Sequence, residues 1–169
     1  MKKVILFIGA PGSGKGSRSK ECKENGYVHI SSSELIEEAG YDISIGGAKI
    51  SDKIVMKLLR KKLNSLGSKS KIILDGFSRR VDQAKLLNDV CSIEQVIYLK
   101  ISPEIALKRV MERLICSNCK MIYTKNSYKP PKKEGFCDDC GSMLVQRESD
   151  TKEIFLKRYA SFERNTYPV

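Results

Sequence analysis

The feature that most constrains this chain is a glycine-rich segment at residues 9–17, with the sequence Gly-Ala-Pro-Gly-Ser-Gly-Lys-Gly-Ser. It follows an apolar run at residues 4–8 and precedes a stretch with helical character. Between a strand and a helix, such glycines let successive backbone N–H groups converge on phosphate oxygens, and the helix amino end adds positive charge. The pattern predicts a nucleotide-binding loop that holds phosphates through Gly12, Ser13, Gly14, Lys15, Gly16 and Ser17.

Short apolar runs rich in β-branched residues alternate with helical stretches along the chain. This alternation predicts parallel strands joined by crossover helices, with ligands bound beyond the carboxyl ends of the strands. A chain of 169 residues is long enough for one sizeable core. We therefore expect an α/β fold with three layers, in which helices cover both faces of a parallel sheet. The expected strands are residues 4–8, 27–30, 71–74 and 95–101, and the expected helices are residues 15–24, 51–66, 82–88, 103–114 and about 151–164.

Residues 115–146 interrupt the alternation with two Cys-x2-Cys pairs. Cys116 and Cys119 form the first pair, and Cys137 and Cys140 form the second. Four thiolates on two such turns suit a tetrahedral Zn²⁺ ion and leave no ligand position open, which indicates a structural site. Loss of the metal, or disulfide pairing, is the alternative. We expect a small zinc-binding module at 115–146, inserted into a core made of residues 1–114 and 147–169.

The charge balance and the apolar runs limit the classes of partner. A net charge of +11 suits a polyanion, which could be nucleic acid, a membrane surface or nucleotide phosphates. The apolar run at residues 4–8 is too short for a signal peptide, and no run approaches the ~18 residues of a membrane span. We expect a soluble cytoplasmic protein with reduced thiols and no membrane partner. Cys22 and Cys91 are then interpreted as ordinary core or surface residues.

Several motifs resemble those of adenylate kinases. The loop at 9–17 resembles theirs, which also places a glycine between the lysine and a hydroxyl residue. Residues 74–79, Leu-Asp-Gly-Phe-Ser-Arg, are similar to the family's Leu-Asp-Gly-Phe-Pro-Arg, with Ser78 in place of the proline. Residues 29–35 look like the family's acceptor strand and turn. The cysteine pairs and the proline-containing residues 129–135 resemble the lid of many bacterial members.

The resemblance implies that ATP donates its terminal phosphoryl group to a nucleoside monophosphate, with AMP as the expected acceptor and ADP as the product. It implies Mg²⁺ as a further cofactor, besides the structural Zn²⁺. Asp75 would hold Mg²⁺ through water, and Arg79 would form a forked contact with the acceptor phosphate. Ser32 and Gly76 would line the acceptor site, and Gln83 would read the acceptor base.

Further arginines match family positions. Arg109 and Arg113 have i, i+4 spacing on one face of the expected helix at 103–114, and they match a family pair. The first member of that pair stacks on the donor base, and the second contacts phosphate. Arg147 resembles the family's lid arginine, and Arg158 resembles an arginine on the following helix; both would contact the transferred phosphates. Phosphoryl transfer depends on such charge neutralisation and positioning. The predicted catalytic groups are Lys15, Asp75, Arg79, Arg113, Arg147 and Arg158.

Two departures from the family concern the acceptor. Glu37 occupies the position of an arginine that grips the acceptor phosphate, and the acceptor-binding segment, about residues 31–60, is shorter than usual. Lys49 or Lys53 would be substitutes. These departures favour an alternative, a kinase for another nucleotide or a small phosphate acceptor. A nucleotide-binding protein without turnover and a zinc-ribbon nucleic-acid binder are further alternatives. A nucleic-acid binder would give the phosphate loop no role, so we expect no nucleic-acid partner. As in the family, we expect a monomer.

Overall fold

The computed structural model describes residues 1–41, 50–125 and 130–169. Lys49 and Lys129, which the sequence singled out, lie outside the described residues. The chain forms two compact units. The first consists of Met1–Gly9, Gly14–Leu99 and Ser161–Val169, and the second consists of Ala10–Ser13 and Lys100–Ala160. Each unit has its own sheet and its own buried residues.

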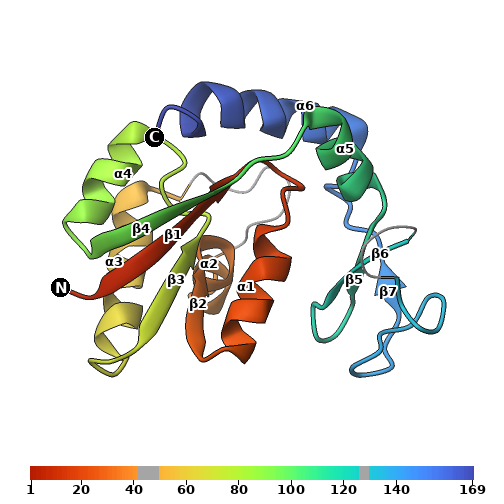
Figure 1. The fold of residues 1–169 in the computed structure, drawn as a ribbon, viewed down its shortest axis with the longest axis horizontal. Helices are drawn as coiled ribbons and strands as arrows, with labels where there is room; N and C mark the ends of the chain where they lie inside the picture. Colours follow the sequence, from red (N-terminus) through yellow and green to blue (C-terminus); the bar gives the residue numbers. More distant parts are fainter. Residues whose placement is uncertain (42–49, 126–129) are drawn as a thin grey trace. The chain divides into compact units, whose positions relative to one another are not determined.

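The first unit is built on a four-stranded parallel sheet with the order β2-β3-β1-β4 (Figure 1). The strands are β1 (Lys3–Gly9), β2 (Tyr27–Ser31), β3 (Lys71–Asp75) and β4 (Ser92–Leu99). Val4, Leu6 and Phe7 of β1 and the three apolar residues of β3 are buried, as expected for central parallel strands. The four expected strands are thus confirmed. The fourth begins earlier than expected, because the N–H of Ser92 donates to Lys2 O at 2.9 Å and Ser92 pairs with Lys3.

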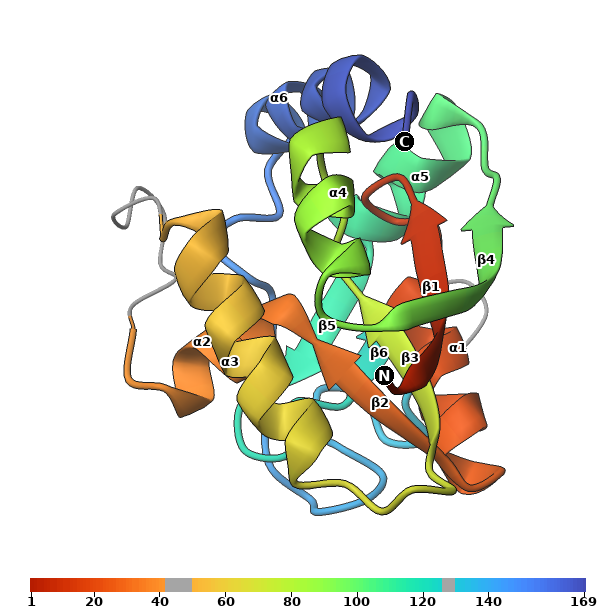
Figure 2. The ribbon, with the colours of Figure 1, turned by 90° about the vertical axis from the view of Figure 1, so that its left-hand side faces the viewer.

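Four helices accompany this sheet: α1 (Lys15–Glu24), α2 (Ser32–Glu38), α3 (Asp52–Asn64) and α4 (Val81–Asn88). Figure 2 shows α3 and α4 along one face of the sheet, with α1 on the opposite face. The hydroxyl of Ser51 caps α3 by accepting from Ile54 N–H, and the helix buries Val55, Met56, Leu59 and Leu63 against the sheet. The expected α/β fold with helices on both faces is confirmed. None of the described helices is long and apolar enough to cross a membrane.

The second unit contains α5 (Pro103–Met111), most of α6 (Lys152–Ser161) and a small antiparallel sheet. That sheet has the order β6-β5-β7, made of β5 (Arg113–Cys116), β6 (Ile122–Thr124) and β7 (Leu144–Val145). The two helices pack through Ala106, Val110 and Phe155. Cys116 ends β5, and the other three cysteines lie in the loops beside the strands. Most of this sheet falls within the segment predicted to be a lid. A π-helical turn, Phe162–Thr166, continues from α6 and belongs to the first unit.

One expected helix is too long. The sequence predicts a helix over residues 103–114, but α5 ends at Met111 with Glu112 as its carboxyl-terminal cap. Arg113 then enters β5 and pairs with Thr124. The prediction was wrong here because the residues after Glu112 pair with β6 and β7 as the central strand of the small sheet, and this tertiary pairing outweighs local helix propensity. Arg109 and Arg113 therefore do not share a helix face.

Candidate active site

The phosphate loop connects β1, which ends at Gly9, to α1, which begins at Lys15. Gly12 and Gly14 have φ angles of 83° and 93°, a region that only glycine enters readily. No side chain caps the amino end of α1, and its first turn holds no acidic residue. The backbone dipole at this end therefore favours an anion. The Lys15 ammonium donates to Gly9 O at 2.6 Å, so the cation lies over the loop.

Gly12 is required for a second reason. A Cβ atom at this position would lie 2.5 Å from Ala106 O and 3.1 Å from Val110 Cγ2, both on α5. Such a contact with a backbone oxygen cannot be relieved by a side-chain rotation. The loop thus follows a path that only a residue without a side chain permits, which suits the close approach of a phosphate to backbone N–H groups.

Asp75 ends β3 at the carboxyl edge of the parallel sheet. Burial raises the pKa of its carboxyl, while the charges of Lys15, His29 and Arg79 lower it. His29 Nε2 lies 3.9 Å from Asp75 Oδ2, and burial lowers the pKa of the histidine, although the neighbouring carboxyl opposes that shift. The edge thus holds a carboxyl group within the field of Lys15. A water-mediated Mg²⁺ contact fits such a group.

Ser32, Gly76 and Arg79 lie together beyond the same strand. The Ser32 hydroxyl donates to Gly76 O at 3.0 Å, and Arg79 Nε donates to the same carbonyl at 3.0 Å. Arg79 Nη2 also donates to Ser32 Oγ at 3.3 Å. A Cβ on Gly76 would lie 2.5 Å from Ser32 Oγ, so the cluster depends on that glycine. The three predicted acceptor-site residues are therefore gathered by direct hydrogen bonds.

Gln83 is buried on α4, and both ends of its amide are bonded. The backbone N–H of Arg79 donates to Gln83 Oε1 at 2.7 Å. Gln83 Nε2 donates to Asp52 Oδ1 at 2.9 Å, and the other oxygen of Asp52 pairs with Arg80. Sequence reasoning missed Asp52, although an acidic residue in the first turn of a helix is a recognisable signal.

In the second unit, Arg113 and Asp150 form a two-bond ion pair. Arg113 Nε donates to Asp150 Oδ2 at 2.7 Å, and Nη2 donates to Oδ1. Asp150 is 2% exposed. The other predicted arginines of this unit lie on exposed segments: Arg109 on α5, Arg147 after β7 and Arg158 on α6. Their contacts with phosphate or base stay predictions.

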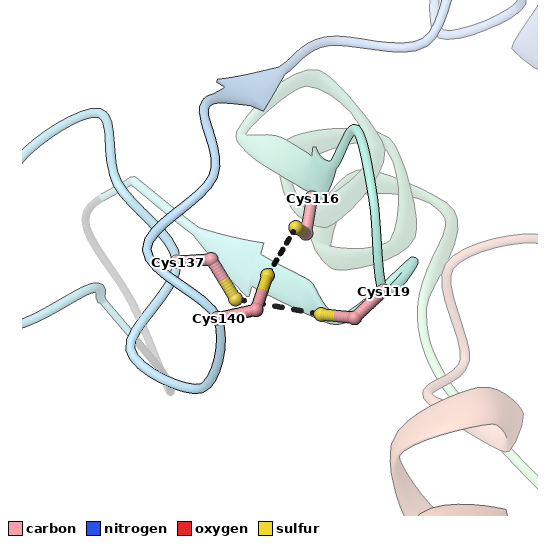
Figure 3. Close-up of side chains that lie close together, drawn as sticks. All are labelled: Cys116, Cys119, Cys137 and Cys140. Carbon is pink, nitrogen blue, oxygen red and sulfur yellow. Dashed lines mark hydrogen bonds between the residues drawn. The ribbon is translucent and has the colours of Figure 1, made fainter.

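The four cysteines converge on one point of the small sheet (Figure 3). Their Sγ atoms all lie within 4.8 Å of one another, with 3.4 Å between Cys116 and Cys140 and 3.5 Å between Cys119 and Cys137. Tetrahedral thiolates around Zn²⁺ are about 3.8 Å apart, from a Zn–S distance of about 2.3 Å. A disulfide would need about 2.05 Å. The spacing fits a tetrahedral metal ion, and the cysteines are free thiols.

The surroundings of the second cysteine pair favour thiolates. The Tyr123 hydroxyl lies 3.4 Å from Cys137 Sγ and lowers the pKa of that thiol. The hydroxyl and backbone of Ser142 lower the pKa of Cys140 to about 5. Tyr123 is 1% exposed, and its oxygen also accepts from Asp138 N–H at 2.9 Å. The sequence identified the four ligands but missed Tyr123, whose oxygen orients one of them.

The chain matches the family model described as adenylate kinase over residues 7–169. It belongs to the adenylate kinase family. Relatives include the adenylate kinases of Malacoplasma penetrans, 38% identical, and Thermosipho africanus, 37% identical. The matches cover 98% of this chain and 81% and 84% of those adenylate kinases. The adenylate kinase of Archaeoglobus fulgidus is 32% identical, over 98% of this chain and 83% of its own length.

Proposed function

We propose that this chain transfers the terminal phosphoryl group of ATP to AMP and releases two molecules of ADP. The observation that carries the proposal is the Arg79 guanidinium, which Ser32 and Gly76 hold beyond β3 in a unit that also contains Asp75 and Lys15. A fixed guanidinium binds a phosphate through parallel hydrogen bonds. Membership of the adenylate kinase family and the names of the relatives support AMP as the acceptor.

The transfer needs positioning and neutralisation of charge more than covalent help. An oxygen of the AMP phosphate attacks the terminal phosphorus of ATP, and the bond to the bridging oxygen breaks, so ADP leaves. Lys15 and the amino end of α1 stabilise the donor phosphates, and Arg79 orients the attacking one. We assign Arg113, Arg147 and Arg158 to the charge that develops during transfer, and Arg109 to the donor base. Asp75 and Ser17 would hold Mg²⁺, which supplies further charge neutralisation.

Glu37 favours a second candidate function. Glu37 is exposed on α2, and its negative charge is of the wrong sign for binding the acceptor phosphate. A kinase of the same fold that takes another nucleoside monophosphate or a small phosphate compound is the alternative that this residue supports. A nucleotide-binding protein without turnover is the remaining one, and the assay that follows separates all three.

We also propose that the four cysteines bind a structural Zn²⁺ ion. The buried cluster of this small sheet consists of Cys116, Tyr123, Cys137 and Leu144, so metal binding would supply most of its folding free energy. Thiolate ligands persist where thiols stay reduced, which supports the cytoplasm as the place of action. We expect the enzyme to act as a monomer on its nucleotides, without a nucleic-acid partner.

The test is a coupled assay of zinc-loaded protein with ATP and AMP, CMP, UMP, GMP or their deoxy forms. We expect AMP to have the highest kcat/KM. Replacing Arg79 by Ala should lower kcat/KM for AMP by about 100-fold or more. Arg60→Ala is the matched control, because Arg60 is an exposed arginine that donates to Asp89 O. Absence of ADP with every acceptor in folded protein would reject both kinase functions, and preference for another acceptor would select the alternative.

A further inference from the structure

The amide of Gln83 is held in a single orientation by two partners of opposite hydrogen-bonding character. The carboxylate of Asp52 can only accept, and it receives Gln83 Nε2 at 2.9 Å. The backbone N–H of Arg79 can only donate, and it reaches Gln83 Oε1 at 2.7 Å. An amide turned by 180° would place its oxygen against the carboxylate and its NH2 group against the N–H. Both contacts would be repulsive, so the buried amide cannot reverse.

The held amide keeps one N–H and one oxygen lone pair for a ligand. Adenine presents an amino donor at N6 beside an acceptor at N1, whereas a 6-oxo purine presents an acceptor at O6 beside a donor at N1. A freely rotating amide can match either edge by turning over. An amide that is fixed at both ends can match only one of them, and the mismatched base leaves two buried polar groups unpaired.

We propose that Asp52 is a positioning residue that makes the acceptor site selective for 6-amino over 6-oxo purine nucleotides, by fixing the orientation of Gln83. The inference rests on the proposed function, in which Gln83 reads the acceptor base. Arg80 pairs with the second oxygen of Asp52, so the ion pair and the hydrogen bond to Gln83 use different oxygens of the carboxylate. Asp52 is the first residue of α3 and directly follows the capping residue Ser51, so the helix fixes its backbone position.

The experiment compares AMP with inosine monophosphate, which differs only at positions 6 and 1 of the purine. For Asp52→Asn, whose amide can both accept and donate, we expect KM for AMP to rise several-fold with kcat within twofold of the wild type. The ratio of kcat/KM for AMP to that for inosine monophosphate should fall about 10-fold. The fall is partial, because the N–H of Arg79 still opposes reversal. For Gln83→Met, which has no polar amide, the ratio should approach one.

Arg80→Gln is the matched control, because it removes the same ion pair but keeps the carboxylate beside Gln83. Its ratio and its KM for AMP should equal those of the wild type, and thermal unfolding of every variant verifies folding. The inference is overturned if Asp52→Asn keeps the wild-type ratio, if Arg80→Gln loses it equally, or if the wild type accepts both nucleotides alike. A wild type that phosphorylates no monophosphate would instead reject the proposed function.

Discussion

Asp150 is buried and accepts two hydrogen bonds from Arg113, which begins the central strand of the small sheet. The carboxylate therefore fixes the position and direction of a guanidinium that is predicted to contact phosphate. Asp150→Ala would leave that cation without its partner in a partly buried place. We expect a loss of about 3 kcal/mol in the free energy of unfolding and a clear fall in kcat. Urea unfolding and steady-state kinetics measure both quantities.

A matched comparison is Glu153→Ala, which breaks the exposed pair between Glu153 and Lys157 on α6. Exposed pairs contribute little, so this variant should be indistinguishable from the wild type. Equal effects of the two substitutions would contradict the assigned role of the Arg113–Asp150 pair.

The close packing of Gly12 gives a prediction for ATP binding. Gly12→Ala would place a methyl group 2.5 Å from Ala106 O at a residue with φ of 83°. The loop must then move, and we expect ATP affinity, measured by calorimetry, to fall about 100-fold or more. Gly26→Ala is the control, since Gly26 has φ of 81° but nothing within 4 Å of its Cβ position. It should cost about 1 kcal/mol of stability and leave ATP binding intact. Normal ATP affinity of Gly12→Ala would refute the argument.

Ser78 gives a prediction that runs against the family pattern. The residue is fully buried and has φ of 58°, and its hydroxyl oxygen is buried without a hydrogen-bond partner. Proline requires φ near −65°. Restoring the family proline by Ser78→Pro should therefore destabilise the protein by about 3 kcal/mol or more, whereas Ser78→Gly should change stability by less than about 1 kcal/mol. Urea unfolding tests both variants, and a stable Ser78→Pro protein would contradict this account of the backbone.

Tyr123 leads to a prediction about the metal. Its hydroxyl lies 3.4 Å from Cys137 Sγ and accepts from Asp138 N–H. Tyr123→Phe keeps the buried ring and removes only the oxygen, so the sheet should stay folded while zinc affinity falls about 10-fold to 100-fold. Competition with a chromogenic chelator measures the affinity. Tyr159→Phe, on α6, is a control that should leave zinc binding unchanged. An unaltered affinity in Tyr123→Phe would show that the hydroxyl does not tune the site.

His29 predicts a pH dependence of stability. Burial lowers the pKa of His29 in the folded protein, so below about pH 6.5 the unfolded chain binds more protons than the folded one. Stability should therefore fall as the pH is lowered from 7.5 to 5.5. Since His29 is the single histidine of the chain, His29→Gln should show a smaller loss over the same interval. Urea unfolding at both pH values, with the two proteins compared, isolates the contribution. Equal losses would exclude the histidine as its source.

Much of the fold could be predicted from the alternation of apolar runs with helical stretches, because apolar runs such as those of β1 and β3 are typical of buried parallel strands. The cysteine ligands could be predicted as well, since their spacing is part of the chemistry. The end of α5 could not, because tertiary strand pairing at Arg113 decides it. Asp52 and Tyr123 were missed for a related reason: each acts through a partner distant in sequence, Gln83 or Cys137, and no local pattern records such a bond.

The small core of the cysteine-bearing sheet has a consequence for the cell. The first unit holds its own extensive core, whereas the small cluster of this sheet would depend on the proposed zinc ion, which must be taken up and shared with other proteins. We expect zinc starvation to leave the amount of folded parallel sheet unchanged while it lowers the fraction of molecules able to turn over. The balance of adenine nucleotides in the cell would then depend on the zinc supply, even where the amount of this protein stays constant.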